Sequence, residues 1–196
     1  MKKFLIILAI VFGVFFIAAL GIFGWAKTTY NSMVQMDETV KNSWAQVENV
    51  LQRRFDLIPN LVATVKGYAT HENEVLTQVT EARARVGGAT APADRMKAEG
   101  ELSGALSRLM MVVENYPNLK ANQNFIMLQD QLEGTENRIA VERGRYNDTV
   151  KVYNQYIRSF PQMILAGIFN FQRKEFFEAP AAAKVAPKVD FKKEKQ

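Results

Sequence analysis

Few residues of this 196-residue chain are of the types that usually carry catalysis or bind metals. The chain has no cysteine, which excludes a thiolate metal site, a cysteine nucleophile and a disulfide framework. Its one histidine, His71, excludes a metal site built from several histidines. His71 and Glu72 look like the start of a zinc-protease helix, but Val75 stands where that motif needs its second histidine. We therefore predict no metal site and no cofactor.

The motifs of nucleotide-binding and acyl-transfer sites are also missing. Gly87 and Gly88 form a glycine pair, but no Lys-Ser or Lys-Thr follows it and no strand pattern precedes it. No serine lies in the glycine-flanked turn of a nucleophile elbow. Glu136 and Glu142 therefore remain as the carboxylates that could act as general acid and base.

Arg54 offers a different role for these carboxylates. It falls on an apolar stripe of the first predicted helix, and burying a charge without a partner costs on the order of several kcal/mol. We expect Arg54 to pair with Glu136 or Glu142 in a polar layer across the bundle, and the neighbouring Arg53 could take its place. Such a pair favours a device that sets helix register over an acid–base site. We predict no catalytic residue and no enzymatic activity, with a carboxylate-based hydrolase as the remaining alternative.

Gly134 lies in the same predicted helix as those carboxylates. Glycine in a helix interior costs roughly 0.5–1 kcal/mol relative to alanine, and it is useful where another backbone approaches closely. The polar residues after it could bind a ligand or space the helices. We interpret residues 134–138 as a point of close packing next to the polar layer.

The helices that position these side chains show a period near seven residues. One row of positions seven residues apart consists of Met33, Val40, Val47, Arg54, Leu61, Tyr68, Val75 and Ala82. The row passes Pro59 without a change of phase, which predicts one long helix over residues 27–86 with Pro59 as a kink and hinge. The alternative is a helix that begins at Pro59, because proline suits a first helical turn.

Two further long helices are predicted, over residues 93–115 and 118–159. The third has its own row, which consists of Phe125, Leu132, Ile139, Tyr146, Tyr153 and Phe160. A short apolar segment, residues 163–171, follows Pro161 and either closes the bundle or lies on the membrane surface. No alternating strand pattern occurs. The predicted fold class is all-α: an N-terminal transmembrane helix followed by an antiparallel up-and-down helical bundle of three long helices plus a short fourth.

The dipeptide Tyr-Asn recurs in these helices at Tyr30, Tyr146 and Tyr153. We interpret the recurrence as helix geometry, which places tyrosine on the core stripe and asparagine beside it. It is too short to be a structural repeat.

The N-terminal stretch from Phe4 to Trp25 contains no charged residue. At about 1.5 Å of rise per residue it covers the roughly 30 Å of bilayer hydrocarbon. We predict a single-pass signal-anchor, and a cleaved signal peptide is the alternative. Lys2 and Lys3 outnumber Lys27, which favours an inside N-terminus and a bundle on the extracytoplasmic side.

The predicted domain organisation is a transmembrane anchor (residues 1–26), a helical-bundle domain (27–178) and a disordered basic tail (179–196). The tail is rich in alanine, proline and lysine and has too few bulky side chains to pack. The net charge of +5 comes partly from lysines at the two ends. Mixed charges elsewhere indicate a solvated surface, so we predict no nucleic-acid partner.

Several motifs, in order along the chain, resemble the LemA family. They are Arg53-Arg54-Phe55-Asp56-Leu57-Ile58-Pro59-Asn60-Leu61-Val62, Val65-Lys66-Gly67-Tyr68-Ala69, Glu114-Asn115-Tyr116-Pro117-Asn118-Leu119-Lys120-Ala121 and Gly134-Thr135-Glu136-Asn137-Arg138-Ile139-Ala140. The resemblance covers the chain from the anchor to about Glu178. It implies a bacterial inner (cytoplasmic) membrane protein with a helical-bundle domain, and it implies no reaction, because the family has no established activity.

The resulting hypothesis is a non-enzymatic scaffold that forms a homo-oligomer or docks a membrane-protein partner. Tethering to a membrane raises the effective concentration of the copies, so that weak contacts suffice. The alternative is a sensory or adaptor module in which Pro59 is the hinge. In that case Arg54 and its partners form the switch that passes a displacement of the transmembrane helix to a partner.

Overall fold

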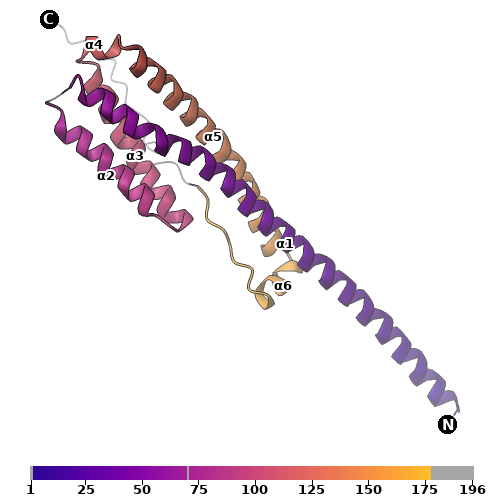
Figure 1. The fold of residues 1–196 in the computed structure, drawn as a ribbon. Coiled ribbons are helices and arrows are strands. Elements are labelled where there is room, and N and C mark those ends of the chain that lie inside the picture. Colours follow the sequence, from indigo (N-terminus) through magenta and orange to yellow (C-terminus); the bar gives the residue numbers. More distant parts are fainter. Residues whose placement is uncertain (1, 70, 178–196) are drawn as a thin grey trace, which may run out of the picture. The chain divides into compact units, whose positions relative to one another are not determined.

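The computed structural model describes residues 2–69 and 71–177, with side chains from residue 4 onward (Figure 1). These residues form no strand and the following helices: α1 (Lys2–Lys66), α2 (Asn73–Gly88), α3 (Pro92–Val113), α4 (Pro117–Lys120), α5 (Gln123–Arg158) and α6 (Gln162–Ile168). The predicted all-α class is confirmed. The predicted disordered tail, residues 179–196, lies outside the described residues.

The helix predicted over residues 27–86 is interrupted, so its predicted extent was wrong. α1 ends at Lys66, and the chain turns before α2 begins at Asn73. In this turn the Tyr68 and Ala69 amides both donate to the Val65 carbonyl, at 3.0 and 2.8 Å. The row of positions seven apart did not reveal the turn because residues on both sides of it are buried in one core. The described chain therefore has two long helices, α1 and α5, and a hairpin of α2 and α3 (Figure 1).

The boundaries marked by glycine and proline were predicted more closely. α2 ends at Gly88, and α3 and α4 begin at Pro92 and Pro117, where the fixed φ of proline suits a first turn. The predicted third helix is divided, because α4 ends before α5 begins. The Asn122 side-chain oxygen accepts the Phe125 amide over 3.1 Å and caps the start of α5.

Pro59 lies inside α1, so the alternative of a helix start at this residue was wrong. A proline here cannot donate to the carbonyl of Phe55. The Nε of Arg83 from α2 donates to that carbonyl instead, over 3.1 Å, and its guanidinium lies 3.7 Å from the centroid of the Phe55 ring. Arg83 thus replaces the missing helical hydrogen bond, and the helix continues through Pro59.

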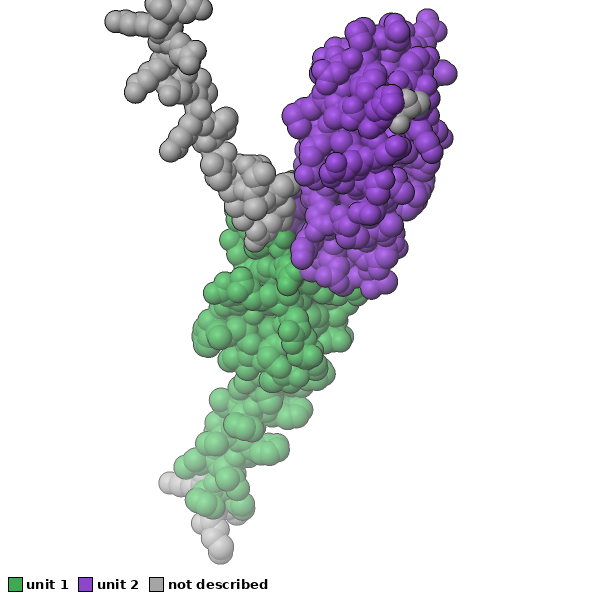
Figure 2. Space-filling view, turned by 90° about the vertical axis from the view of Figure 1, so that its left-hand side faces the viewer, with its two compact units in different colours: residues 1–47, 144–176 green, residues 48–143, 177–196 purple. Residues whose placement is uncertain are grey.

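The chain divides into two compact units (Figure 2): unit 1 comprises residues 1–47 and 144–176, and unit 2 comprises residues 48–143 and 177–196. Unit 2 has a core of side chains that are at most 1% exposed, among them Ile58, Leu61, Val65, Val79, Leu102, Leu109, Leu119 and Phe125. The core of unit 1 includes Met33, Val40, Val47, Tyr146, Val150, Tyr153 and Ile157. Each unit therefore has a core of its own.

The first part of α1 is apolar on all sides and exposed. Its large apolar side chains between Phe4 and Phe23 are 56–73% exposed. By length and composition this part of the helix can cross a membrane. A surface of this extent is more stable in lipid than in water, so this part of α1 is a candidate membrane span.

Candidate functional site

Arg54 is buried in the middle of unit 2 and is 2% exposed. Its Nη1 donates to Glu136 Oε2 at 2.6 Å and to Ser103 Oγ at 2.9 Å. Its Nη2 donates to the carboxylate of Glu99 and, at 3.4 Å, to the Glu99 carbonyl. These four residues, which we call the polar layer, come from α1, α3 and α5. The structure therefore brings the predicted residues Arg54 and Glu136 together and adds two from α3.

Glu99 and Ser103 were not predicted as members of the polar layer, and Glu99 is the charged one of the two. It is 3% exposed, and its Oε1 lies 3.8 Å from the Nε of Arg95. It stands three residues before Leu102, on the same buried face of α3. A carboxylate on the apolar stripe of an amphipathic helix was the available signal, because such a position normally faces the core.

The other predicted polar residues lie at the margin. Arg53 is exposed on α1, and Glu142 is half-buried on α5. Arg143 lies beside the layer, and its guanidinium is 4.2 Å from the centroid of the Phe177 ring. Burial lowers the pKa of Arg143, the charge of Glu136 opposes this shift, and the charge of Arg54 adds to it.

The geometry of the polar layer fits a structural ion pair better than an acid–base pair. A general acid or base has to reach a proton of its substrate. The Glu99 side chain is enclosed and bonded to Arg54, whereas the Glu136 side chain is 53% exposed.

A shallow groove on unit 2 contains none of the polar layer and is lined by Asn60, Ala63, Thr64, Asn124, Met127, Leu128 and Gln131.

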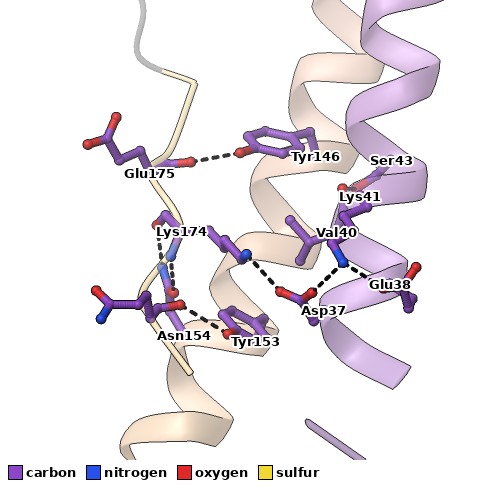
Figure 3. A network of polar contacts seen from close by, with 11 residues as sticks. Asp37, Glu38, Val40, Lys41, Ser43, Tyr146, Tyr153, Asn154, Lys174 and Glu175 are labelled. Atoms are coloured by element: carbon purple, nitrogen blue, oxygen red, sulfur yellow. Dashed lines mark hydrogen bonds and ion pairs between the residues drawn. The ribbon is translucent and has the colours of Figure 1, made fainter. Parts of the chain in front are cut away.

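A second polar network lies in unit 1, where an extended segment runs along α5 (Figure 3). We call this segment, residues 171–176, the strap. The hydroxyl of Tyr153 donates to the carbonyl of Gln172 over 3.0 Å. The hydroxyl of Tyr146 donates to the carbonyl of Glu175, also over 3.0 Å. Both tyrosines thus present a buried ring to the core and a hydroxyl to the strap.

Asn154 and Asp37 complete the attachment of the strap at Lys174 (Figure 3). The Asn154 amide donates to the Lys174 carbonyl and accepts from the Lys174 N–H, both at 2.9 Å, as a neighbouring strand would. The Lys174 Nζ lies 2.7 Å from Asp37 Oδ1, and Lys41 lies 2.9 Å from the other oxygen. The strap is therefore held through its backbone and through one lysine side chain.

The electrostatics of this network follow from burial and from the lysines. Burial raises the pKa of Asp37, but hydrogen bonds from Lys174 and Lys41 outweigh this effect, so that the pKa lies below its usual value. Burial, with a contribution from the charge of Asp37, raises the pKa of Tyr153 to about 12. The Tyr153 hydroxyl therefore remains a donor to the strap over the physiological pH range.

The Tyr-Asn dipeptides were predicted to reflect helix geometry, which is confirmed for the placement of Tyr146 and Tyr153 but does not account for their polar contacts. The tyrosines do lie on the core stripe, since Tyr146 and Tyr153 are 4% and 1% exposed. Their polar atoms, however, bind the strap. The recurrence seven residues apart was the only signal in the sequence.

The predicted close packing at Gly134 was also wrong. Apart from its chain neighbours and the backbone of its own helix, a Cβ built on Gly134 would meet no described atom within 4 Å. Gly134 therefore faces open space on α5, and nothing within the described chain accounts for the cost of a glycine there.

A membrane-length apolar helix that continues into a helical bundle defines the class of membrane-linked helical proteins. The chain belongs to the LemA family, whose family model matches residues 43–191. The matched region contains the polar layer and the strap.

Three relatives extend this comparison. The magnetosome protein MamQ 2 of Paramagnetospirillum magneticum is 29% identical over 182 residues, which is 78% of this chain and 66% of that protein. MamQ of Magnetospirillum gryphiswaldense is 28% identical over 179 residues, with the same coverage. Protein LemA of Metamycoplasma hominis is 23% identical over 179 residues, which is 89% of this chain and 80% of that protein. The chain thus spans 66% of the length of the MamQ relatives that it matches.

Proposed function

We propose that this protein is a non-enzymatic membrane scaffold that self-associates through an exposed face of α5. The observation that carries the proposal is the continuity of α1. One helix, Lys2–Lys66, contains both the apolar anchor and the core residues Met33 and Leu61. Residues 1–26 hold the helical domain, residues 27–178, at the membrane. Copies confined to two dimensions reach a high effective concentration, so a modest contact area suffices.

An exposed stripe on α5 supports self-association. Met127 and Val141 are 53% and 52% exposed, and Gly134 lies midway between them at a spacing of seven residues. This spacing keeps the three residues on one side of a helix. The small Gly134 permits close approach of a second helix, which would account for a glycine at a position that faces open space within the described chain.

Disulfide crosslinking in native membranes tests this face directly, because the chain has no cysteine of its own. We expect Val141→Cys to form covalent dimers under mild oxidation. The matched control is Ala140→Cys, which is also exposed but points about 100° away around the helix. Equal crosslinking of the two variants, or none of either, would rule out α5 as the assembly face.

We further propose that the polar layer fixes the register of α1, α3 and α5 rather than supporting a reaction. Arg54 is bonded to both other helices at once, so a shift of one helix by a turn would leave its charge unpaired. The protein thereby presents one defined arrangement of its assembly face.

The location that we propose is the bacterial inner membrane, with the helical domain on the extracytoplasmic side. Lys2 and Lys3 precede the anchor, and Lys27 follows it, which favours an inside N-terminus. A membrane-impermeant maleimide should label Asn124→Cys on intact cells that have been made permeable only at the outer membrane. Labelling that requires lysis of the inner membrane would reverse the assignment.

An adaptor that docks another membrane protein is the second candidate. Pro59, the proposed hinge, lies within α1, and the Phe55 carbonyl that it leaves free is held by a side chain of α2. A change in that hydrogen bond would alter the helix that leads to the anchor. Replacing Pro59 with alanine without any effect on a partner would remove the basis for this candidate.

A further inference from the structure

We propose that α6, together with Phe160, is a second membrane contact that inserts into the anionic surface of the bilayer entered by α1. This inference rests on the proposed membrane anchor. The surface concerned lies in unit 1 and is separate from the anchor and from the assembly face on α5. Its proposed occupant is the surface of an anionic lipid bilayer.

The position of α6 follows from contacts that the residues just after it make with α1. The Tyr30 ring packs edge-on against Phe169, with centroids 4.7 Å apart, and against Phe171 at 5.8 Å. Tyr30 is five residues beyond Trp25, which at 1.5 Å of rise per residue is about 7.5 Å along the helix. The headgroup region adds about 5–7 Å to each side of the hydrocarbon. With Trp25 at the edge of the hydrocarbon, these contacts would place the end of α6 at the level of the headgroups.

The surface of α6 is divided into two faces. Leu165 and Ala166 are 8% and 5% exposed and pack into unit 1. The other face is apolar and open to solvent in the described structure, and it consists of Phe160 (79% exposed), Met163 (54%), Ile164 (52%), Ile168 (68%) and Phe169 (51%). A helix of this length cannot span a bilayer, but an apolar face of this kind binds at its surface.

The basic residues near α6 favour an anionic lipid surface over a second copy of the same face. The chain has 20 acidic residues, and none of them lies in residues 1–36 or 149–174. Within these two segments Lys27, Arg158 and Arg173 are exposed. Basic side chains beside an apolar face are attracted to anionic headgroups. A second copy of the same face would instead bring like charges together, because a two-fold contact pairs identical surfaces.

The test uses the full chain in vesicles of phosphatidylcholine mixed with phosphatidylglycerol. Single cysteines at Ile168→Cys, Gln172→Cys and Phe16→Cys carry a fluorophore, and lipids with nitroxide groups near the headgroup or deep in the acyl chain act as quenchers. Gln172 is the matched control, since it is exposed on the strap next to α6. We expect shallow quenching at Ile168 to exceed that at Gln172 by about twofold or more, as insertion of the face requires.

The outcomes separate this inference from the anchor. Deep quenching at Phe16 without excess quenching at Ile168 would overturn the inference and leave the anchor intact. An unquenched Phe16 would overturn both. A fluorophore at Ile168 could also be shielded from water without being quenched by the nitroxide lipids. If this shielding disappears when the protein is diluted with additional lipid, the face binds a second copy, and the inference is overturned.

The charge requirement is tested separately with Arg158→Gln combined with Arg173→Gln. Both side chains are exposed, so the fold should tolerate the change. We expect the excess quenching at Ile168 to fall to the value measured in phosphatidylcholine alone. An unchanged excess would overturn the preference for anionic lipid.

Discussion

At the scale of single residues, Arg83 shows how α1 tolerates a proline in its interior. The Phe55 carbonyl accepts from Arg83 because Pro59 has no N–H to offer. We predict that Arg83→Met lowers the free energy of unfolding by about 1–2 kcal/mol, since it leaves that carbonyl unsatisfied. In a protein that already carries Pro59→Ala, Arg83→Met should lower the free energy of unfolding by less, because the new backbone N–H at position 59 donates to the Phe55 carbonyl. Denaturant unfolding of the full chain in detergent, followed by far-UV circular dichroism, measures the double-mutant cycle.

Arg85→Met is the control for this cycle. Arg85 is exposed on α2 and pairs with Glu101 at the surface over 2.8 Å, so its loss should cost at most about 1 kcal/mol. A loss at Arg83 that is identical with and without Pro59 would show that Arg83 acts only through its contact with the Phe55 ring.

The polar layer makes a second prediction at this scale. Glu99→Ala removes a buried partner and leaves Arg54 partly unpaired, so we expect it to lower the free energy of unfolding by about 3–5 kcal/mol. Glu136→Ala should cost about 1 kcal/mol or less, because the Glu136 side chain is half-exposed. The exposed neighbour Arg53→Met serves as the control and should change the value by about 0.5 kcal/mol at most. The reverse order of Glu99 and Glu136 would contradict this description of the layer.

The partners of Arg54 show how much of the polar layer could be predicted from the sequence. A charge on a core stripe predicted that an acid must meet it, and the predicted contact with Glu136 is present. The stripe of α3 also contained Glu99, but its pairing with Arg54 depends on how three helices face one another. That arrangement is set by packing of whole helix surfaces, which a period along one helix does not specify.

At the scale of elements, the strap is held on α5 by the side-chain amide of Asn154. We predict that Asn154→Ala frees the strap and accelerates tryptic cleavage after Arg173 and Lys174, because both backbone hydrogen bonds of Lys174 are lost. Limited proteolysis with mass spectrometry measures the rate at these two bonds. Gln155→Ala, an exposed neighbour on α5, is the control and should leave the rate unchanged. Equal rates for the two variants would mean that Asn154 does not hold the strap.

Acid should loosen the same element. The pKa of Asp37 is lower in the folded protein than its usual value near 3.8, so the ionised form stabilises the fold. That contribution is fully present above about pH 4 and disappears as the pH falls through the lowered pKa. We predict that the Lys174 amide exchanges its hydrogen faster once the pH falls through this lowered pKa. The comparison is made after correction for the pH dependence of the intrinsic exchange rate. Asp37→Asn should show the faster exchange at all pH values. If the variant instead has the same pH profile as the unmodified protein, Asp37 is excluded as the cause.

Helix boundaries were predictable where the chain itself stops a helix. Gly88, Pro92 and Pro117 mark ends and starts through backbone preferences that act locally. The turn after Lys66 was not predictable from the apolar pattern, because Val65 and Val79 belong to one core on both sides of it. The strap was missed for a related reason: a segment without regular structure leaves no periodic pattern, and only its partners on α5 recur.

At the scale of the whole molecule, the membrane attachment and the assembly that we propose depend on two different helices. α1 contains the apolar, membrane-length segment and core residues such as Met33 and Leu61. α5 supplies the buried partners of that core and, on its other side, the exposed stripe of Met127, Gly134 and Val141. The function that we propose follows from this division: one helix fixes the protein at the membrane, and the other faces neighbouring copies.

Crosslinking of the unmodified chain on intact cells, with mass-spectrometric identification of the linked peptides, tests the central claim most directly. A lysine-reactive crosslinker is suitable because Lys120 and Lys151 are exposed near the two ends of α5. We predict that most crosslinks of this chain join two copies of it and involve these lysines. Crosslinks that mainly join it to one other protein, or a chain recovered only as a monomer, would contradict the self-associating scaffold.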